Sequence, residues 1–342
     1  MSRVVSRRRV LQSGIAATLA SALPPIAFAD ELDYKPAVPG RPVPPKSEFV
    51  KSSTAEEVTA GMDLSGMTAL VTGCNSGLGL ETMRVLALRG AHVIGAARTL
   101  AKAEAACASV AGTTTPIVVE LTDWPGIVAA GNQVAEMDRP IDMLILNAGI
   151  MALPELRQAH GLELQFAVNH LGHFLLENRL HDQVVAARAG RVVVVSSGAH
   201  RWAPEEGIQF DNLSGEKGYD PRQAYGQSKV ANGLFSRELA RRLSETNATS
   251  NSLHPGVIPT NLSRYQPERK YDMSNPMFKT IPQGAATQCF VATSPVLDGV
   301  TGYYFDDSNP AVPSRQMQDD DMAAKLWEVS TDLVADYLKD NG

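Results

Sequence analysis

The chain has 342 residues, of which 44% are hydrophobic and 20% are charged, and its formal net charge is −6. This composition is typical of a well-packed globular protein, and the length allows one large α/β domain or two small ones. Residues 1–29 contain four arginines and no acidic residue, so the remainder of the chain carries a charge of −10. A body that acidic repels a phosphate backbone, which excludes nucleic acid as an expected partner.

The first 29 residues have the three parts of a secretory signal peptide. The basic stretch SRRRVLQ (6–12) leads into an apolar run over residues 10–23, which is shorter than the roughly 20 residues that span a bilayer. Two prolines end the run, and AFA (27–29) offers small residues for cleavage. SRRRVLQ resembles the twin-arginine signal, with glutamine in place of the usual lysine.

We therefore expect export by the twin-arginine route to a bacterial periplasm, with no stable membrane span after the signal is removed. An uncleaved N-terminus that tethers the protein to a membrane is the alternative.

Residues 30–53 contain five prolines and no apolar periodicity, so we expect an extended linker that lies outside the core. The remaining residues, 54–342, are expected to form one domain.

Short apolar runs alternate with helical segments from residue 66 onward. This alternation predicts a single Rossmann-like α/β domain, with a doubly wound parallel sheet of about seven strands and helices on both faces. The irregular segments 198–222 and 260–282 are candidate lids over a pocket at the carboxyl ends of the strands. The expected strands are residues 67–72, 91–96, 116–120, 141–146, 191–196, 250–254 and 302–305.

The segment TGCNSGLG (72–79) follows the first expected strand and opens the first expected helix. Its glycines allow a tight turn and let backbone N–H groups approach a pyrophosphate at the helix N-terminus. The strand–loop–helix context indicates a dinucleotide site.

The end of the second expected strand bears on the choice of nucleotide. An enzyme that prefers NAD(H) commonly has an acidic residue there, which accepts hydrogen bonds from the ribose 2′-hydroxyl. This chain has Ala97-Arg98-Thr99 instead, and Lys102 follows one helical turn later. A guanidinium group suits a 2′-phosphate, so we predict NADP(H) as the cofactor in preference to NAD(H).

A tyrosine and a lysine stand four residues apart, at Tyr225 and Lys229, in a predicted helix. This spacing places the phenol and the ammonium on one face of the helix. A cation near a phenol favours the phenolate, so we expect the pKa of Tyr225 to lie below its usual value near 10. Ser196 and Ser197 end an apolar strand, where a hydroxyl can polarise a carbonyl group.

Several motifs follow one another along the chain in a fixed order: TGxxxGxG (72–79), NAG (147–149), Asn169, Ser197, YxxxK (225–229) and PGxIxT (255–260). Taken in this order, they resemble the short-chain dehydrogenase/reductase family over about residues 54–305. The stretches VNHLGHF, EGIQFDNL and GVTGYYF are most similar to the branch that holds retinol dehydrogenases and WW-domain oxidoreductases, and STAEEV and VLALRGAHV resemble a plant chloroplast-envelope member of it.

The resemblance implies an oxidoreductase that interconverts a carbonyl group and an alcohol on a hydrophobic small molecule. It implies Tyr225 as the general acid/base, and Lys229 as the modulator of its pKa and a contact of the nicotinamide ribose. Ser197 would hold the substrate oxygen, and Asn169 would position a water in a proton relay. The expected nucleotide-binding residues are Gly73, Asn75, Ser76, Gly77, Leu78, Gly79, Arg98, Glu120, Leu121, Asn147, Ala148, Gly149, Tyr225, Lys229, Pro255, Gly256, Ile258 and Thr260.

Two positions depart from the family pattern. Leu146 replaces the first asparagine of the usual NNAG, and Glu120 stands where the family often has an aspartate beside the adenine.

Two other functions are alternatives. A nucleotide-sugar epimerase also uses YxxxK, but its glycine loop has a different spacing. A non-catalytic NADP(H)-binding sensor or interaction protein would not need the intact catalytic set.

Other reactive residues are assigned structural roles. His170 and His173 lie three residues apart inside VNHLGHF without a recognisable third ligand, and His254 adjoins a proline, so we predict no metal site. The three cysteines are far apart and indicate no disulfide framework. The resemblance is compatible with a homo-oligomer and with a monomer.

Overall fold

The computed structural model describes residues 34–266 and 271–339. The expected signal peptide, residues 1–29, lies outside this part of the chain. Among the helices of the described residues, none combines the length and the apolar character that crossing a membrane requires.

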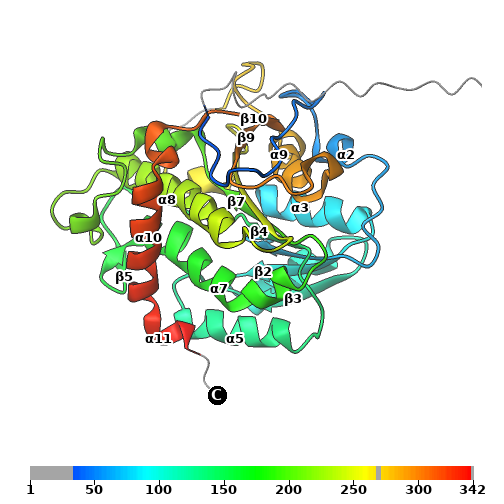
Figure 1. Ribbon diagram of the computed structural model, residues 1–342, viewed down its shortest axis with the longest axis horizontal. Helices are drawn as coiled ribbons and strands as arrows, with labels where there is room; N and C mark the ends of the chain where they lie inside the picture. Colours follow the sequence, from blue (N-terminus) through cyan, green and yellow to red (C-terminus); the bar gives the residue numbers. More distant parts are fainter. Residues whose placement is uncertain (1–33, 267–270, 340–342) are drawn as a thin grey trace, which may run out of the picture.

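A mostly parallel sheet occupies the centre of the molecule (Figure 1). The strands of the structure are β1 (Thr68–Thr72), β2 (His92–Ala97), β3 (Thr114–Val118), β4 (Met143–Leu146), β5 (Gln158–Ala159), β6 (Leu162–Glu163), β7 (Arg191–Val195), β8 (Thr249–His254), β9 (Tyr304–Asp306) and β10 (Asn309–Pro310). The eight-stranded sheet has the order β10-β9-β8-β7-β4-β1-β2-β3, and only β10 is antiparallel to its neighbour. The predicted doubly wound sheet is thus confirmed.

The sequence missed two small features, and its predicted bounds differ from the structure by up to two residues at three strands, β3, β4 and β9. The edge strand β10 and the separate β5–β6 hairpin are two-residue strands, too short to show a periodic pattern. Strand β3 begins two residues before the predicted segment 116–120, because Thr114 and Thr115 already pair with Val93 and Ile94.

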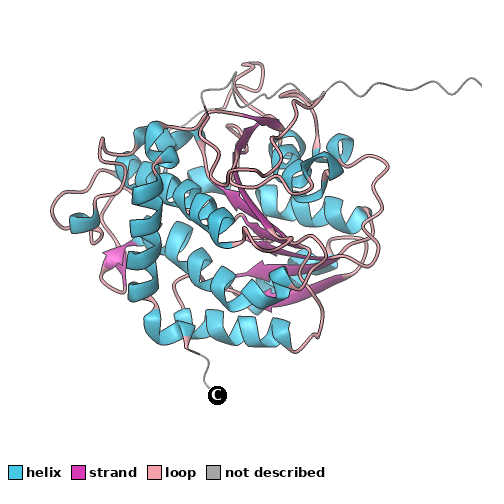
Figure 2. Ribbon diagram, in the orientation of Figure 1, coloured by secondary structure: helices cyan, strands magenta, loops and turns pink. Residues whose placement is uncertain are grey.

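Helices cover both faces of the sheet (Figure 2). The helices are α2 (Ala55–Val58), α3 (Gly77–Leu88), α4 (Leu100–Ala108), α5 (Trp124–Ala135), α6 (Leu164–Phe166), α7 (Gly172–Val185), α8 (Pro221–Arg242), α9 (Ile281–Thr293), α10 (Asp320–Leu333) and α11 (Ala335–Leu338). The single turns are the π-helix η1 (Ala167–Leu171) and the 3-10 helices η2 (Gly198–Trp202), η3 (Phe210–Asn212), η4 (Asn261–Tyr265), η5 (Pro295–Leu297) and η6 (Arg315–Gln318).

The side-chain alternation of the strands divides the core into two layers. Leu70 of β1 packs in the layer beneath α5, α7 and α8, whereas Ala69 and Val71 pack in the layer beneath α3, α4 and α9. Helix α10 then packs on α8 (Figure 1). Because both faces are covered, every residue of β1 is buried, as in parallel sheets generally.

Residues 34–53, here called the N-terminal strap, correct one expectation. The strap has no helix or strand, as predicted, but it does not lie outside the core. The Tyr34 ring is buried and stacks on Tyr303, and the Arg41 guanidinium donates hydrogen bonds of 2.7 and 2.8 Å to the carbonyl oxygens of Ser244 and Thr246. Burial of an aromatic ring and satisfaction of exposed carbonyls hold the strap beside the β9–β10 edge (Figure 1).

Candidate active site

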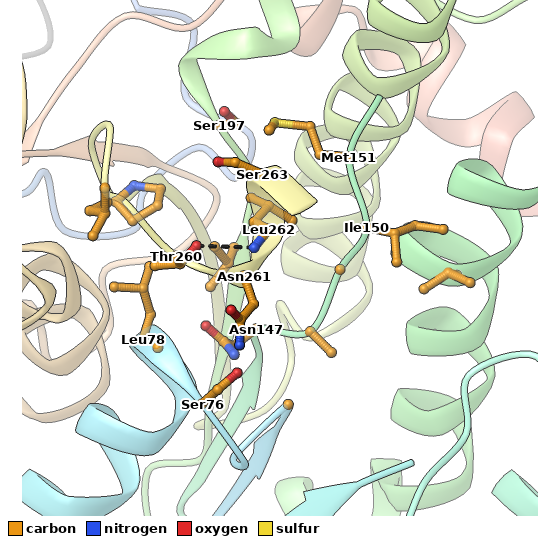
Figure 3. Close-up of a pocket in the computed structure, with 18 of the residues that line it drawn as sticks. Ser76, Leu78, Asn147, Ile150, Met151, Ser197, Thr260, Asn261, Leu262 and Ser263 are labelled. Atoms are coloured by element: carbon orange, nitrogen blue, oxygen red, sulfur yellow. Dashed lines mark hydrogen bonds between the residues drawn. The ribbon is translucent and has the colours of Figure 1, made fainter. Parts of the chain in front are cut away.

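One cavity of about 640 Å³ opens at the carboxyl ends of β1, β2, β4, β7 and β8. Doubly wound folds bind ligands at this edge, beside the point where the strand order reverses, and the reversal here lies between β1 and β4. In Figure 3, Ser76 and Leu78 lie toward α3, Ser197 and Met151 lie at the opposite side, and residues 260–263 pass between them.

The structure brings nearly all of the predicted site residues to this cavity. Only Gly79 and Asn169 do not line it. The predicted residues that do are Gly73, Asn75, Ser76, Gly77, Leu78, Arg98, Glu120, Leu121, Asn147, Ala148, Gly149, Ser197, Tyr225, Lys229, Pro255, Gly256, Ile258 and Thr260.

The glycine loop between β1 and α3 is shaped by backbone contacts. Gly73 has a φ of +69°, which disfavours any other residue. A Cβ at Gly79 would lie 2.3 Å from the Gly73 carbonyl oxygen, so only glycine lets α3 start this close to the end of β1. Ser76, the residue before α3, makes no side-chain capping bond, which leaves the first N–H groups of a 12-residue helix available to an anion.

Hydrogen bonds of Thr72 connect the residues after β4 to the start of the glycine loop. Its hydroxyl oxygen accepts hydrogen bonds from the backbone N–H groups of Asn147 and Ala148, at 2.9 and 3.0 Å. The Asn147 side chain donates to the Thr72 carbonyl oxygen at 2.8 Å. His173 Nδ1 donates to the Asn169 carbonyl oxygen, so its Nε2, which is 2.9 Å from the Thr72 hydroxyl, accepts from it. His173 thus has a structural role.

Asn169 lies in the π-helix η1, a rare local structure that is frequent at functional sites. Its side chain is fully buried behind the loop that follows β4. Its Oδ1 accepts from the Ile150 N–H, and its Nδ2 donates to the Ile150 carbonyl and to the Ser228 hydroxyl, all at 2.9 Å. The side chain therefore holds Ile150 in place and has no N–H left for the predicted water.

Helix α8 presents Tyr225 and Lys229 to the cavity. Asp220 caps its first turn by accepting from two backbone N–H groups, and Pro221 occupies the first helical position, where its missing N–H costs nothing. One turn into the helix, Tyr225 is 3% exposed, and Lys229 Nζ is 5.6 Å from the Tyr225 ring centroid. Lys229 Nζ donates to the Val195 carbonyl at 3.0 Å.

The pKa values of this pair correct the expectation of a phenolate-favouring site. Burial raises the pKa of Tyr225 to about 12, and its hydrogen bond with Ser197 opposes that shift only in part. Burial also lowers the pKa of Lys229 to about 7. A lysine that loses its own charge near neutrality is a weak source of positive potential, so desolvation of the phenol dominates. Tyr225 is accordingly a protonated phenol at neutral pH.

The two serines after β7 have different roles. The Ser196 hydroxyl donates to the Lys229 carbonyl at 2.7 Å and is buried, as expected for a structural residue. The Ser197 Oγ accepts from the Ala199 N–H at 3.1 Å and bonds to Tyr225, so it stands at the cavity beside the phenol.

The two ends of the cavity differ in polarity. Arg98 and Lys102 are exposed at the end near β2, and Glu120 is the acidic residue that lines it. At the other end, Met151, Ala152, Ala199 and Tyr225 form a small buried apolar cluster, against which Leu262 packs. Residues of both predicted lid segments line the cavity, which agrees with their expected positions.

Sequence reasoning missed most of this apolar end. Met151 stands two residues after the NAG segment, so its position close to a strand end was a usable signal. Trp202 and Leu262 lie in irregular segments, where no periodicity points to a cavity. His254 also lines the cavity, although the sequence suggested only a structural role.

Comparisons with known proteins agree with this geometry. The family model "short chain dehydrogenase" matches residues 67–270. The chain is 42% identical over 304 residues to "Short-chain dehydrogenase TIC 32 B, chloroplastic" of Brassica napus, a match that covers 84% of this chain and 95% of the relative. It is 38% identical over 295 residues to human "Retinol dehydrogenase 14", which covers 79% of this chain and 87% of the relative.

A solved structure of an uncharacterised protein from Mycobacterium paratuberculosis superposes with a TM-score of 0.67 at 34% identity, covering 81% of this chain and 97% of that one. The predicted resemblance to the retinol dehydrogenase branch is thus confirmed. The chain belongs to the short-chain dehydrogenase family and is an oxidoreductase of that family.

Proposed function

We propose that this protein is an NADP(H)-dependent oxidoreductase that interconverts a carbonyl group and an alcohol on a hydrophobic small molecule. One observation carries the proposal: a single cavity joins two exposed cations, Arg98 and Lys102, to the buried Tyr225 and its half-buried partner Ser197. The first end suits the phosphate of a dinucleotide, and the second suits the oxygen of a carbonyl group.

The residues at the nucleotide end fit NADP(H). Ala97 ends β2 where an acidic residue would repel a 2′-phosphate, and the guanidinium of Arg98 can pair with that phosphate as a planar fork. The uncapped N-terminus of α3 offers backbone N–H groups to the pyrophosphate. The glycine at position 79 allows the close approach of loop and helix on which this cradle depends.

The chemistry at the other end is proton transfer at a polarised oxygen. A nicotinamide nucleotide, when bound, supplies or accepts the hydride. Ser197 and Tyr225 donate hydrogen bonds to the carbonyl oxygen, and the Tyr225 phenol delivers the proton during reduction. The raised pKa of Tyr225 keeps the phenol protonated at neutral pH, which is the form that reduction requires. The Lys229 amino group lies 5.6 Å from the centroid of the Tyr225 ring.

The apolar end selects the substrate class. The oxygen-binding pair opens onto Met151, Ala199 and Leu262, and Trp202 stands close to Tyr225, with ring centroids 6.3 Å apart. Such walls bind the hydrocarbon part of a ligand through the hydrophobic effect. We therefore favour apolar aldehydes, ketones and alcohols over small polar carbonyl compounds.

A spectrophotometric assay tests this function. The purified chain is mixed with NADPH or NADH and a panel that runs from small polar to long-chain aldehydes and ketones, and absorbance of the reduced nicotinamide is followed. We expect NADPH to be oxidised faster than NADH, and kcat/KM to rise with the apolar length of the substrate. Nucleotide binding without turnover across the whole panel would instead favour a non-catalytic sensor.

We also propose that the mature protein begins at about Asp30 and functions in a periplasm with its nucleotide tightly bound. The twin-arginine route carries folded proteins, so a nucleotide-binding domain can be loaded before export. Because no NADP(H) pool is expected there, the bound nucleotide would be recycled between two substrates. Protein isolated from the periplasm should release nucleotide on denaturation. Recovery of nucleotide-free protein that binds NADPH only weakly would contradict this proposal.

A further inference from the structure

His254 occupies a position between the two halves of the active site. It is the last residue of β8 and precedes Pro255 of the PGxIxT motif. Its ring lines the cavity and is partly exposed there. Strand β8 lies next to β7, and their last paired residues are Leu253 and Val195.

The ring makes one specific hydrogen bond, to the backbone beside Ser197. The Gly198 N–H donates to His254 Nδ1 at 2.9 Å, so Nδ1 carries no proton. Burial and, to a smaller extent, the nearby Lys279 ammonium lower the pKa of His254 to about 4, so the ring is neutral and keeps this acceptor. A Cβ at Gly198 would lie 3.3 Å from Nε2, which shows that the ring also packs against this glycine.

This hydrogen bond connects β8 to the chain after β7 at the point where backbone hydrogen bonding between the two strands ends. Pro255 has no N–H, so the parallel ladder between β7 and β8 has no further donor on that strand. The imidazole provides the next connection, from the end of β8 to the peptide that joins Ser197 and Gly198. It therefore fixes the direction of the backbone that carries the Ser197 hydroxyl.

The carbonyl group of Pro255 is also held in place, by the buried side chain of Lys279. Lys279 Nζ donates to the Pro255 carbonyl at 3.2 Å and pairs with Asp307 at 2.5 Å, and the lysine is 2% exposed. With Pro255 anchored on this side, the His254 ring cannot easily follow a movement of Gly198.

We propose that His254 is a positioning residue that sets the Ser197 hydroxyl for the substrate oxygen by holding the Ser197–Gly198 peptide through its Nδ1. This inference rests on the proposed oxidoreductase function. It predicts that loss of His254 lowers the rate of the chemical step by displacing Ser197. It also predicts that any hydrogen-bond acceptor at the position of Nδ1 is enough to keep Ser197 in place.

Three substitutions separate this role from simple packing. Asparagine places an acceptor oxygen where Nδ1 stands, glutamine places it one bond further out, and leucine removes it. We expect H254L and H254Q to lower kcat on the order of 10–100-fold, as small misplacements of a catalytic group do, and H254N to recover most of the loss. Thermal unfolding and the Kd for NADPH, measured for all three, identify general damage to the fold.

A double-mutant cycle supplies the second readout. If His254 acts through Ser197, then H254L added to S197A lowers kcat little more than S197A alone. Full additivity, or an H254N enzyme as impaired as H254L, would overturn the inference. A wild-type enzyme that turns over no carbonyl compound refutes the proposed function and this inference together, whereas an active wild type with additive losses refutes only the role of His254.

Discussion

The two ends of the cavity are built by different means. At the nucleotide end, contacts with main-chain atoms set the shape: the Gly73 carbonyl oxygen leaves no room for a side chain at Gly79, and the Thr72 hydroxyl accepts hydrogen bonds from the backbone N–H groups after β4. At the substrate end, side chains from irregular segments set the shape, among them Met151 and Leu262.

This difference separates nucleotide binding from substrate choice. A backbone cradle tolerates few residue types, because a single added Cβ forces main-chain atoms to move. An apolar wall tolerates exchange among hydrophobic residues of similar size, because its contacts are non-directional. Substitutions at the substrate end should therefore alter substrate preference while leaving nucleotide affinity unchanged, and substitutions at the nucleotide end should do the reverse.

The largest expected effect is at the junction of the two ends. Tyr225→Phe removes the proton donor and should lower turnover by roughly 10²–10⁴-fold, the usual contribution of a general acid. Since the ring remains, the NADPH dissociation constant, measured by fluorescence titration, should stay near that of the wild type. Tyr337→Phe, a matched loss of a phenol near the C-terminus, should change neither quantity. Near-normal turnover by Tyr225→Phe would disprove the assignment.

At the nucleotide end, Arg98→Ala should weaken NADPH binding about tenfold, as expected for the loss of an exposed charge-assisted contact. NADH lacks the 2′-phosphate, so its affinity should change little. Isothermal titration of both nucleotides measures the ratio. Arg188→Ala provides the control, because Arg188 is an exposed arginine just before the amino end of β7, whereas the cavity lies at the carboxyl ends of the strands. Equal losses of affinity for both nucleotides would contradict a contact with the 2′-phosphate.

At the substrate end, Leu262→Ala should raise the KM for apolar substrates about fivefold, since a half-buried apolar side chain contributes about 1 kcal/mol. The KM for small carbonyl compounds and the affinity for NADPH should be unchanged. Leu88→Ala removes a more exposed leucine on α3, away from the cavity, and should have no effect on either. An equal rise in KM for polar and apolar substrates would break the proposed division.

The smallest expected effect is a pH dependence of stability. Burial lowers the pKa of Lys229 to about 7, below its ordinary value of 10.5, so the unfolded chain binds more protons between these pH values. The free energy of unfolding of the wild type, relative to Lys229→Met, should therefore increase from pH 7 toward pH 10. Urea unfolding at several pH values measures it, with the exposed Lys217→Met as control. A flat difference across this range would show that Lys229 is not desolvated as described.

The sequence predicted the fold and the nucleotide end because both leave local patterns. Strand periodicity, the glycine spacing of residues 72–79 and the i, i+4 pair Tyr225 and Lys229 are all readable within a few residues. The failures involve contacts between distant residues. Tyr34 packs on Tyr303, and burial rather than the neighbouring lysine sets the pKa of Tyr225.

Side-chain direction was a second limit. The motif position of Asn169 was readable, but its amide faces Ile150 rather than the cavity. His254 appeared to be a structural residue because its partner, Gly198, lies in the turn η2 that follows another strand, β7. Neither fact follows from spacing along the chain, since each depends on how neighbouring strands of the sheet end.

The most direct test of the account follows the hydride itself. Wild-type protein, NADPH deuterated at the transferred position of the nicotinamide and an apolar aldehyde are incubated together, and the alcohol product is analysed by mass spectrometry. The account predicts one deuterium on the carbinol carbon of the wild-type product, and roughly 10²–10⁴-fold slower formation of that product by Tyr225→Phe. An alcohol without deuterium, or deuterated nucleotide left unconsumed with every apolar carbonyl compound tried, would contradict it.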